Sequence, residues 1–141
     1  MNYSRILLAG LAATVVYFAI GGLSFALLPQ LADEFRKYPA VYRTQEGMKS
    51  VMPIGMAAMF VGILVLAVLY AMMYRAASGV AEGAGFGALI GIFAVCVFVL
   101  HNYVNLNIGL KLTLQQATVY FIEWTVVGIL IGVIYRPKGA V

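Results

Sequence analysis

The sequence predicts an all-α integral membrane protein in which four transmembrane helices form a compact bundle. Two observations indicate this fold class. Of the 141 residues, 64% are apolar and only 10% are Asp, Glu, Lys or Arg, whereas about a quarter of a soluble domain is charged. The few charges are also confined almost entirely to short stretches between four long apolar runs. Each run is long enough to cross a hydrocarbon core, which takes about 20 helical residues.

The four predicted spans lie at residues 6–28, 54–74, 83–108 and 114–135, and the uncharged run of the third begins at Phe86. The first run is longer than the apolar core of a secretory signal, which has about 7 to 15 residues, and no clear small-residue cleavage site follows it. We therefore interpret it as a span. The whole chain, residues 1–141, is expected to form one domain with a single sizeable extramembrane loop at residues 29–53.

This loop contains a pattern that is typical of a short interfacial helix. Leu31, Phe35 and Tyr38 follow i, i+4, i+7 spacing among charged residues and precede Pro39. The spacing predicts an amphipathic helix that lies at the membrane surface. A solvated connector with aromatic anchors is the alternative interpretation.

The turn between the third and fourth spans is predicted to be tight. Gly109 can adopt the left-handed conformation that ends a helix. Thr113 and Gln116 have the spacing of a capping box that would begin the next helix. We place the centre of this turn between Leu110 and Lys111.

With that centre, polar residues of the two spans lie at matching depths. Asn105 is level with Gln116, His101 is level with Tyr120, and Glu123 lies one helical turn deeper. Glu123 is the only formally charged residue inside a predicted span. The candidate ligand-binding or proton-handling residues are therefore Glu123, His101, Tyr120, Gln116, Asn105 and Trp124.

Three interpretations of this polar cluster stay open. An acidic residue at the centre of a membrane helix costs about 2.5 to 3.5 kcal/mol, so Glu123 is a candidate for ligand binding or proton transfer. The cluster is alternatively interhelical hydrogen bonding that contributes about 0.6 to 2 kcal/mol per pair. In the third interpretation, His101 is the axial ligand of a haem or chlorophyll-type ring. No resident cofactor or metal is predicted.

Small residues mark the faces on which helices are expected to pack. The third span carries Gly83, Gly87 and Gly91 at four-residue spacing, and the fourth carries Gly128 and Gly132. Such small-xxx-small patterns allow close helix contacts, either within the bundle or between protomers. On the first span, one helical stripe is expected to face protein and consists of Thr14, Tyr17, Gly21 and Ser24.

Several function classes are not indicated by the sequence. The lone Cys96 excludes an internal disulfide. The net charge of +4 comes from basic residues that flank the apolar runs, where they anchor helices at lipid headgroups rather than bind nucleic acid. Hydrolase and metalloprotease motifs are absent, so the sequence does not indicate an enzyme.

The topology and function follow as expectations. Four spans put both termini on one side of the membrane, and basic residues close to the span ends favour the cytoplasmic side. We expect a small membrane protein that binds a small ligand or ion at a partly polar intramembrane pocket, as transporters and carriers do. The alternative is a noncatalytic accessory or assembly subunit of a larger membrane complex or homo-oligomer, in which the polar cluster is structural.

Overall fold

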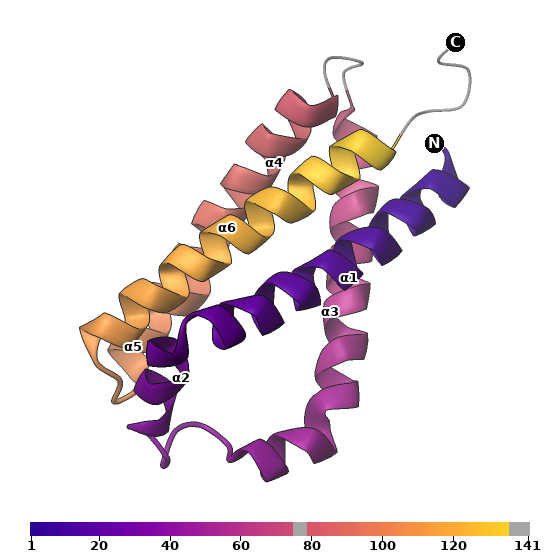
Figure 1. Ribbon diagram of the computed structural model, residues 1–141. Coiled ribbons are helices and arrows are strands. Elements are labelled where there is room, and N and C mark those ends of the chain that lie inside the picture. Colours follow the sequence, from indigo (N-terminus) through magenta and orange to yellow (C-terminus); the bar gives the residue numbers. More distant parts are fainter. Residues whose placement is uncertain (75–78, 136–141) are drawn as a thin grey trace.

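The computed structural model describes residues 1–74 and 79–135, and within these ranges all regular structure is helical (Figure 1). The elements are α1 (Tyr3–Leu27), α2 (Pro29–Arg36), α3 (Gln45–Met73), α4 (Gly79–Ala94), the π-helical segment η1 (Val95–Leu100), α5 (His101–Asn105) and α6 (Leu110–Ile134). Because α4, η1 and α5 are continuous, four helical stretches are long and apolar enough to cross a membrane. The predicted fold class, an all-α membrane protein with four spans, is confirmed.

The outer surface of the helices is apolar, as expected for a surface that faces lipid. Val15, Leu89 and Val104, for example, are 62%, 68% and 79% exposed. Exposed apolar side chains of this size along every span would be unfavourable in water. The molecule is therefore consistent with an integral, multi-pass membrane protein.

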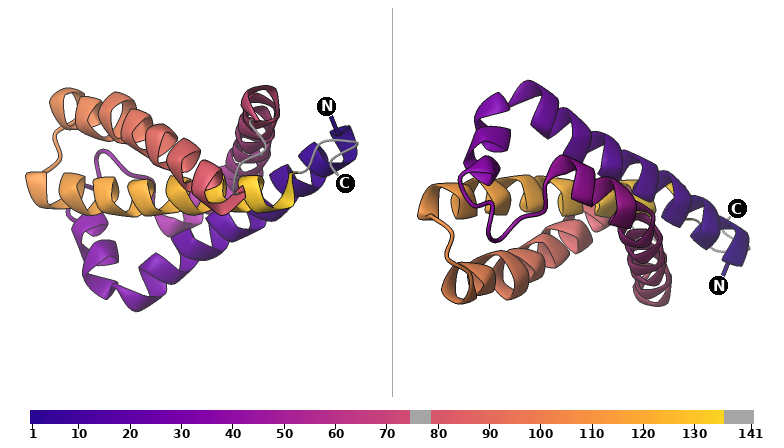
Figure 2. Two further views of the ribbon diagram at one scale, coloured as in Figure 1. Left: turned by 90° about the horizontal axis from the view of Figure 1, so that it is seen from above. Right: turned by 90° about the horizontal axis from the view of Figure 1, so that it is seen from below.

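Helix α6 occupies the centre of the arrangement. It lies between α4 and α1, which flank it on opposite sides (Figure 2), and α3 packs mainly on α1. The first turn of α1 and the last turn of α6 lie at the same end of the bundle (Figure 1). On which side of the membrane this end lies stays a prediction.

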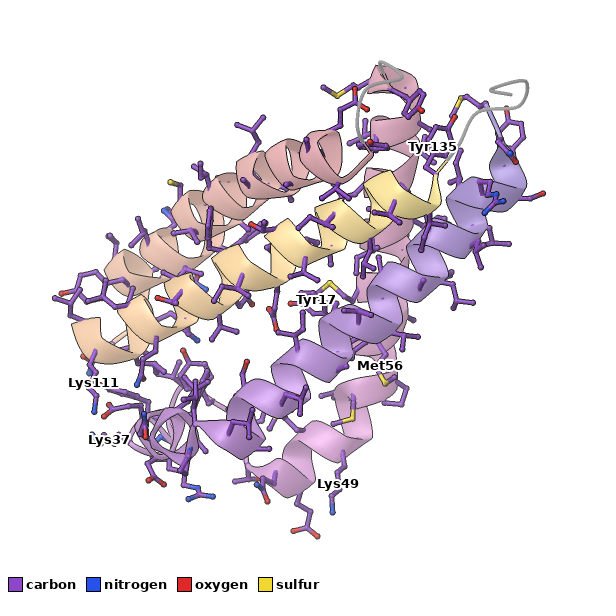
Figure 3. All side chains as sticks on the ribbon, turned by 45° about the horizontal axis from the view of Figure 1, so that its top comes forward. Tyr17, Lys37, Lys49, Met56, Lys111 and Tyr135 are labelled. Atoms are coloured by element: carbon purple, nitrogen blue, oxygen red, sulfur yellow. The ribbon has the colours of Figure 1, made fainter. Side chains whose placement is uncertain are left out.

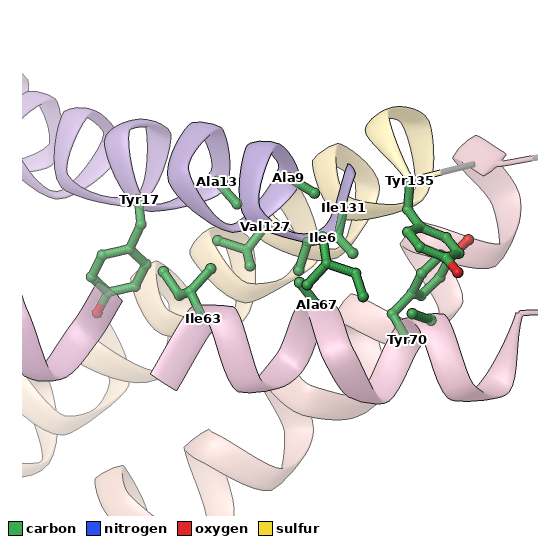
Figure 4. Packing of buried hydrophobic residues seen from close by; sticks show 11 residues of the cluster. Ile6, Ala9, Ala13, Tyr17, Ile63, Ala67, Tyr70, Val127, Ile131 and Tyr135 are labelled. Carbon is green, nitrogen blue, oxygen red and sulfur yellow. The ribbon is translucent and has the colours of Figure 1, made fainter. Parts of the chain in front are cut away.

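The main core forms where α1, α3 and α6 meet (Figure 4). Ala9 and Ala13 are fully buried on α1, and their small size lets α3 and α6 approach closely. Tyr17 lies at one end of this core, whereas Tyr70 and Tyr135 lie at the other. The prediction that the stripe on the first span faces protein is confirmed for Thr14 and Tyr17, which are both buried.

Helices α4 and α6 touch through their glycines. A Cβ atom at Gly87 would lie 2.5 Å from the carbonyl oxygen of Trp124 and 2.7 Å from that of Thr125. Gly83 lies directly against the backbone of Gly128. The predicted glycine faces thus meet within the chain, and the backbones approach as closely as small-xxx-small packing permits.

The same contact includes the ends of the two glycine rows. Gly132 lies against the backbone of Gly79 and Gly83, whereas Gly91 lies against Phe121, with its Cβ position 3.1 Å from Cδ2 of that ring. The helices therefore run antiparallel, and the contact is closest towards the end of α6.

The turn between α5 and α6 differs from the prediction. The predicted left-handed conformation of Gly109 is wrong, because its φ of −80° and ψ of 154° are extended. Gly109 instead precedes the first residue of α6, and its amide donates a hydrogen bond of 2.9 Å to the hydroxyl of Tyr38. A Cβ atom at Gly109 would collide with that hydroxyl, so glycine is needed here for close approach rather than for backbone conformation.

The predicted capping box is also wrong. Helix α6 begins at Leu110, so Thr113 already lies inside the helix, where its hydroxyl donates to the Gly109 carbonyl at 3.1 Å. Gln116 bonds to the hydroxyl of Tyr42 instead of a helix cap. Thr113 cannot cap the helix because α6 already begins one turn earlier, at Leu110, directly after the Gly109 contact with Tyr38.

Helix α3 begins well before the predicted span. Thr44 caps its first turn by accepting a hydrogen bond of 3.1 Å from the Gly47 amide, and Pro53 lies within the helix. At 1.5 Å per residue, the 29 residues of α3 extend about 43 Å, which exceeds the hydrocarbon thickness of about 30 Å. We therefore expect the first turns, which carry Glu46 and Lys49, to lie at the membrane surface.

The short helix predicted in the first loop is present as α2. Its buried Leu31 packs against Ile108 and Leu112 at the turn that leads into α6. Phe35 and Tyr38 border the same cluster. The apolar face of α2 therefore covers protein.

An ionic contact fixes α2 to α6. The carboxylate of Glu34 accepts hydrogen bonds from Lys111 at 2.6 Å and from Lys37 at 2.7 Å, and the two lysines lie at the same end of the molecule (Figure 3). The Glu34 side chain is only 4% exposed, although both lysines are largely exposed. These hydrogen bonds, that of Lys111 first, hold the pKa of Glu34 below its ordinary value.

The Glu34 contact predicts an acid-sensitive docking of α2. Because the pKa of Glu34 is lowered in the folded state, its contribution is present above the unfolded pKa and is lost as the pH falls through the folded pKa. Glu34→Gln should therefore increase amide exchange in residues 29–38 at neutral pH and remove its acid dependence. Hydrogen exchange, corrected for intrinsic rates, measures both effects.

The matched control is Asp33→Asn. Asp33 pairs with Arg36 at 2.9 Å, but both side chains are more than half exposed, and such pairs contribute little. Equal exchange in the two variants would contradict the role of Glu34.

Candidate functional site

Glu123 lies buried between α6 and α1. Glu123 is only 3% exposed. Along the axis of α6 it lies about 20 Å from the first residue of the helix, at 1.5 Å per residue. Its Oε1 atom is 3.1 Å from the position that a Cβ atom would take at Gly21 of α1. The absence of a side chain at Gly21 thus makes room for the carboxyl group.

Aromatic residues surround this carboxyl group. The phenol of Tyr17, on α1, faces it at hydrogen-bonding range, and Tyr120 precedes it by three residues, about one turn, on α6. The rings of Tyr17 and Trp124 pack with their centroids 5.3 Å apart. Indole Nε1 of Trp124 is buried without a hydrogen-bond partner among the described residues. The surroundings therefore combine one carboxyl group, two phenols and an unused N–H donor.

No cation compensates Glu123 within the described part of the chain. None of the ion pairs found between described residues includes Glu123. An uncompensated carboxylate in a membrane interior is unfavourable, and intramembrane carboxyl groups commonly mark ligand or ion sites. Glu123 is thus a buried carboxyl group without a cationic partner among the described residues.

The structure does not bring His101 to Glu123. His101 and Asn105 are both exposed on α5, close to the turn. Because α5 ends at Asn105 and α6 starts at Leu110, His101 lies near the first turns of α6, and its depth differs from that of Glu123 by about 14 Å at 1.5 Å per residue. The predicted match in depth between His101 and Tyr120 was wrong, because the centre of the turn lies earlier than Leu110.

Gln116 lies apart from the carboxyl group and contacts the segment before α3. Its Nε2 atom donates a hydrogen bond of 3.3 Å to the hydroxyl of Tyr42. Gln116, Tyr120 and Glu123 follow i, i+4, i+7 spacing along α6. Gln116, Tyr120 and Glu123 therefore form one polar row on the face of α6 that is turned towards α1 and the first loop.

Tyr17 and Gly21 are the site residues that the sequence analysis did not assign. Their stripe was expected to face protein, but no spacing connected the first span to Glu123. One signal was present: Gly128 follows Glu123 by five residues, which is about 140° around a helix at 3.6 residues per turn. Because Gly128 faces α4, the carboxyl group of Glu123 must point away from α4.

The remaining chemistry of the chain is limited. Among the described residues, no three His, Cys, Asp or Glu side chains gather as a metal site. His101, considered above as a haem or chlorophyll-type ligand, is exposed on α5, so a ring bound there would lie outside the bundle. Cys96 is a free thiol, exposed in η1.

The fold and the site define a four-helix membrane protein with a carboxyl group enclosed between its first and last spans. The chain matches no protein-family model, no curated protein and no solved structure.

Proposed function

We propose that this protein binds a small organic cation at Glu123 inside the membrane, as a transporter or carrier of such ligands. The observation that supports the proposal is the burial of the Glu123 carboxyl group, without a cationic partner in the described residues, beside the aromatic rings of Tyr17 and Trp124. Carboxylate charge and aromatic faces together are the chemistry that recognises organic cations.

The energetics of burial favour a cationic ligand over a neutral one. A charged carboxylate inside the membrane requires an opposite charge or several donors to offset its desolvation. A bound cation provides that charge, and its own desolvation is offset by cation–π contacts of about 2 kcal/mol. The unused Nε1 donor of Trp124 is available to an acceptor group on the same ligand.

The depth of Glu123 agrees with a transport role. Glu123 lies near the middle of α6, which runs from Leu110 to Ile134. Membrane transporters bind their substrates near the bilayer midplane, from which release to either side is achieved by moving helices. Because Gly21 has no side chain, α1 leaves space beside Glu123 where it packs against α6.

The alternative, an accessory or assembly subunit, would need a surface other than the glycine faces. Gly83, Gly87 and Gly128 already contact one another's helices within the chain. A partner or a second copy would therefore have to pack elsewhere.

Binding of tetraphenylphosphonium, a hydrophobic organic cation, tests the proposal. Isothermal titration of the protein in neutral detergent should show binding that weakens by about 30-fold or more in Glu123→Gln, because removing one partner of a buried charge pair costs about 2 kcal/mol or more. Glu46→Gln removes the same charge from an exposed position on α3 and should bind as the wild type does.

A comparison of thermal unfolding shows whether Glu123→Gln keeps the fold, since Gln has nearly the same shape. The proposal is contradicted if the wild-type protein does not bind tetraphenylphosphonium, or if Glu123→Gln and Glu46→Gln bind it equally.

A further inference from the structure

A second feature of the molecule is a cavity of about 730 Å³ between the end of α1, helix α2 and the start of α3. Its volume falls within the range of small-molecule sites, about 300 to 1,000 Å³. Its wall includes Phe25, Phe35, Tyr42, Met48, Arg36 and Arg43. Neither Glu123 nor Tyr17 lines it, so the cavity is separate from the site described above.

One part of the cavity wall is apolar and aromatic. The rings of Phe25 and Phe35 pack with centroids 5.4 Å apart, and those of Phe35 and Tyr42 are 4.8 Å apart. Met48 of α3 adds an adaptable apolar surface. A hydrocarbon chain fits such a wall.

The charged residues of the wall are both arginines. Arg36 is paired with Asp33 at 2.9 Å, whereas Arg43 takes part in none of the ion pairs found in the described residues. Of the residues that the structure describes, no Asp or Glu side chain lines the cavity. The cavity is therefore electropositive and suited to a carboxylate or a phosphate, which arginine binds through paired N–H donors.

The apolar wall and the arginines of the cavity lie at different depths in the membrane. Gly22 lies more than one turn inside the end of α1 at Leu27, whereas Arg43 precedes the first turn of α3. The ends of two spans meet here, so Arg43 is expected at the level of the lipid headgroups and Gly22 deeper.

We propose that this cavity binds an anionic amphiphile, an acyl chain that ends in a carboxylate or phosphate. The anionic group pairs with Arg43, and the acyl chain lies against Phe25, Phe35 and Met48. The inference does not depend on cation binding at Glu123, because Gly21 faces the carboxyl group while its neighbour Gly22 lines the cavity.

Native mass spectrometry of the protein in neutral detergent tests this proposal. Dioleoyl phosphatidic acid, offered with an equal amount of dioleoyl phosphatidylcholine, should be retained preferentially by the wild type. Arg43→Gln should reduce the retained phosphatidic acid about fivefold, the effect expected for one arginine near a lipid surface. Lys49→Gln removes the same charge from α3 outside the cavity lining and should leave retention unchanged.

Two further arms define the ligand. Oleate in place of phosphatidic acid distinguishes a free fatty acid from a bilayer phospholipid, and preference for either anion over phosphatidylcholine supports the proposal. Ala26→Trp, which places a large ring in the cavity, should displace the bound amphiphile while circular dichroism shows an unchanged helix content. Equal retention of phosphatidic acid and phosphatidylcholine with no retained oleate, equal loss in Arg43→Gln and Lys49→Gln, or full retention in Ala26→Trp would overturn it.

Discussion

Replacing Gly87 by Leu should lower the free energy of unfolding by about 2 kcal/mol or more, since overpacking a close contact typically costs about 1 to 3 kcal/mol. A Cβ atom at this position would already lie 2.5 Å from the Trp124 carbonyl oxygen and 2.9 Å from Cα of Thr125. These neighbours are backbone atoms, so relief requires α4 to move away from α6. Unfolding in mixed detergent micelles measures the loss.

The same helix offers a matched control for this prediction. A Cβ atom at Gly85 would meet no atom within 4 Å, so Gly85→Leu adds the same bulk towards the surroundings of the bundle and should be nearly neutral. If Gly87→Leu and Gly85→Leu unfold at the same detergent concentration as the wild type, the close α4–α6 contact does not exist.

Gly21→Leu should weaken tetraphenylphosphonium binding by about tenfold or more while Glu123 itself is unchanged. The new side chain would begin 3.1 Å from Oε1 of Glu123 and would occupy the space beside the carboxyl group. A tenfold loss of affinity corresponds to about 1.4 kcal/mol of binding free energy. Titration calorimetry of the variant protein measures the change.

The control for Gly21→Leu is Ala19→Leu, an exposed position on the same helix. It adds apolar bulk on a different face of α1 and should leave the affinity unchanged. An unchanged affinity in Gly21→Leu, or an equal loss in Ala19→Leu, would show that the ligand does not lie between α1 and Glu123.

The spans were predictable because they depend on composition alone. Long apolar runs separated by clustered charges define four helices whatever their partners are. The helix ends were less predictable, because they depend on contacts between distant parts of the chain. Gly109, directly before α6, contacts Tyr38 of the first loop. Helix α3 begins at the turn capped by Thr44, although Pro53 lies within the helix.

The candidate site was predictable in its central residue but not in its surroundings. Glu123 stands out in the sequence as the only formally charged residue of the predicted spans. Its partners depend on which helix lies against α6 on that side, and the helix is α1, with Tyr17 and Gly21, rather than α5 with His101. Glu123 lies about 140° around α6 from the glycine face. Because α4 covers the glycine face, the carboxyl group of Glu123 points towards another helix.

The position of helix α2 also could not be predicted from the sequence. Its amphipathic spacing predicted a helix, but the salt bridge between Glu34 and Lys111 joins residues that are far apart in the sequence. No local pattern indicates that pairing. The position of α2, and with it one wall of the cavity near Phe35, therefore becomes known only from the folded chain.

The central claim, that the Glu123 carboxyl group binds a cation within the membrane, is tested most directly at that residue. Dicyclohexylcarbodiimide, a membrane-soluble reagent that modifies carboxyl groups, should label Glu123, and tetraphenylphosphonium should protect it, as read by peptide mass spectrometry. Glu46, exposed at the start of α3, serves as the internal reference for protection. Labelling of Glu123 that tetraphenylphosphonium reduces selectively is the result this account predicts, and labelling of Glu123 that is equal with and without the cation would contradict it.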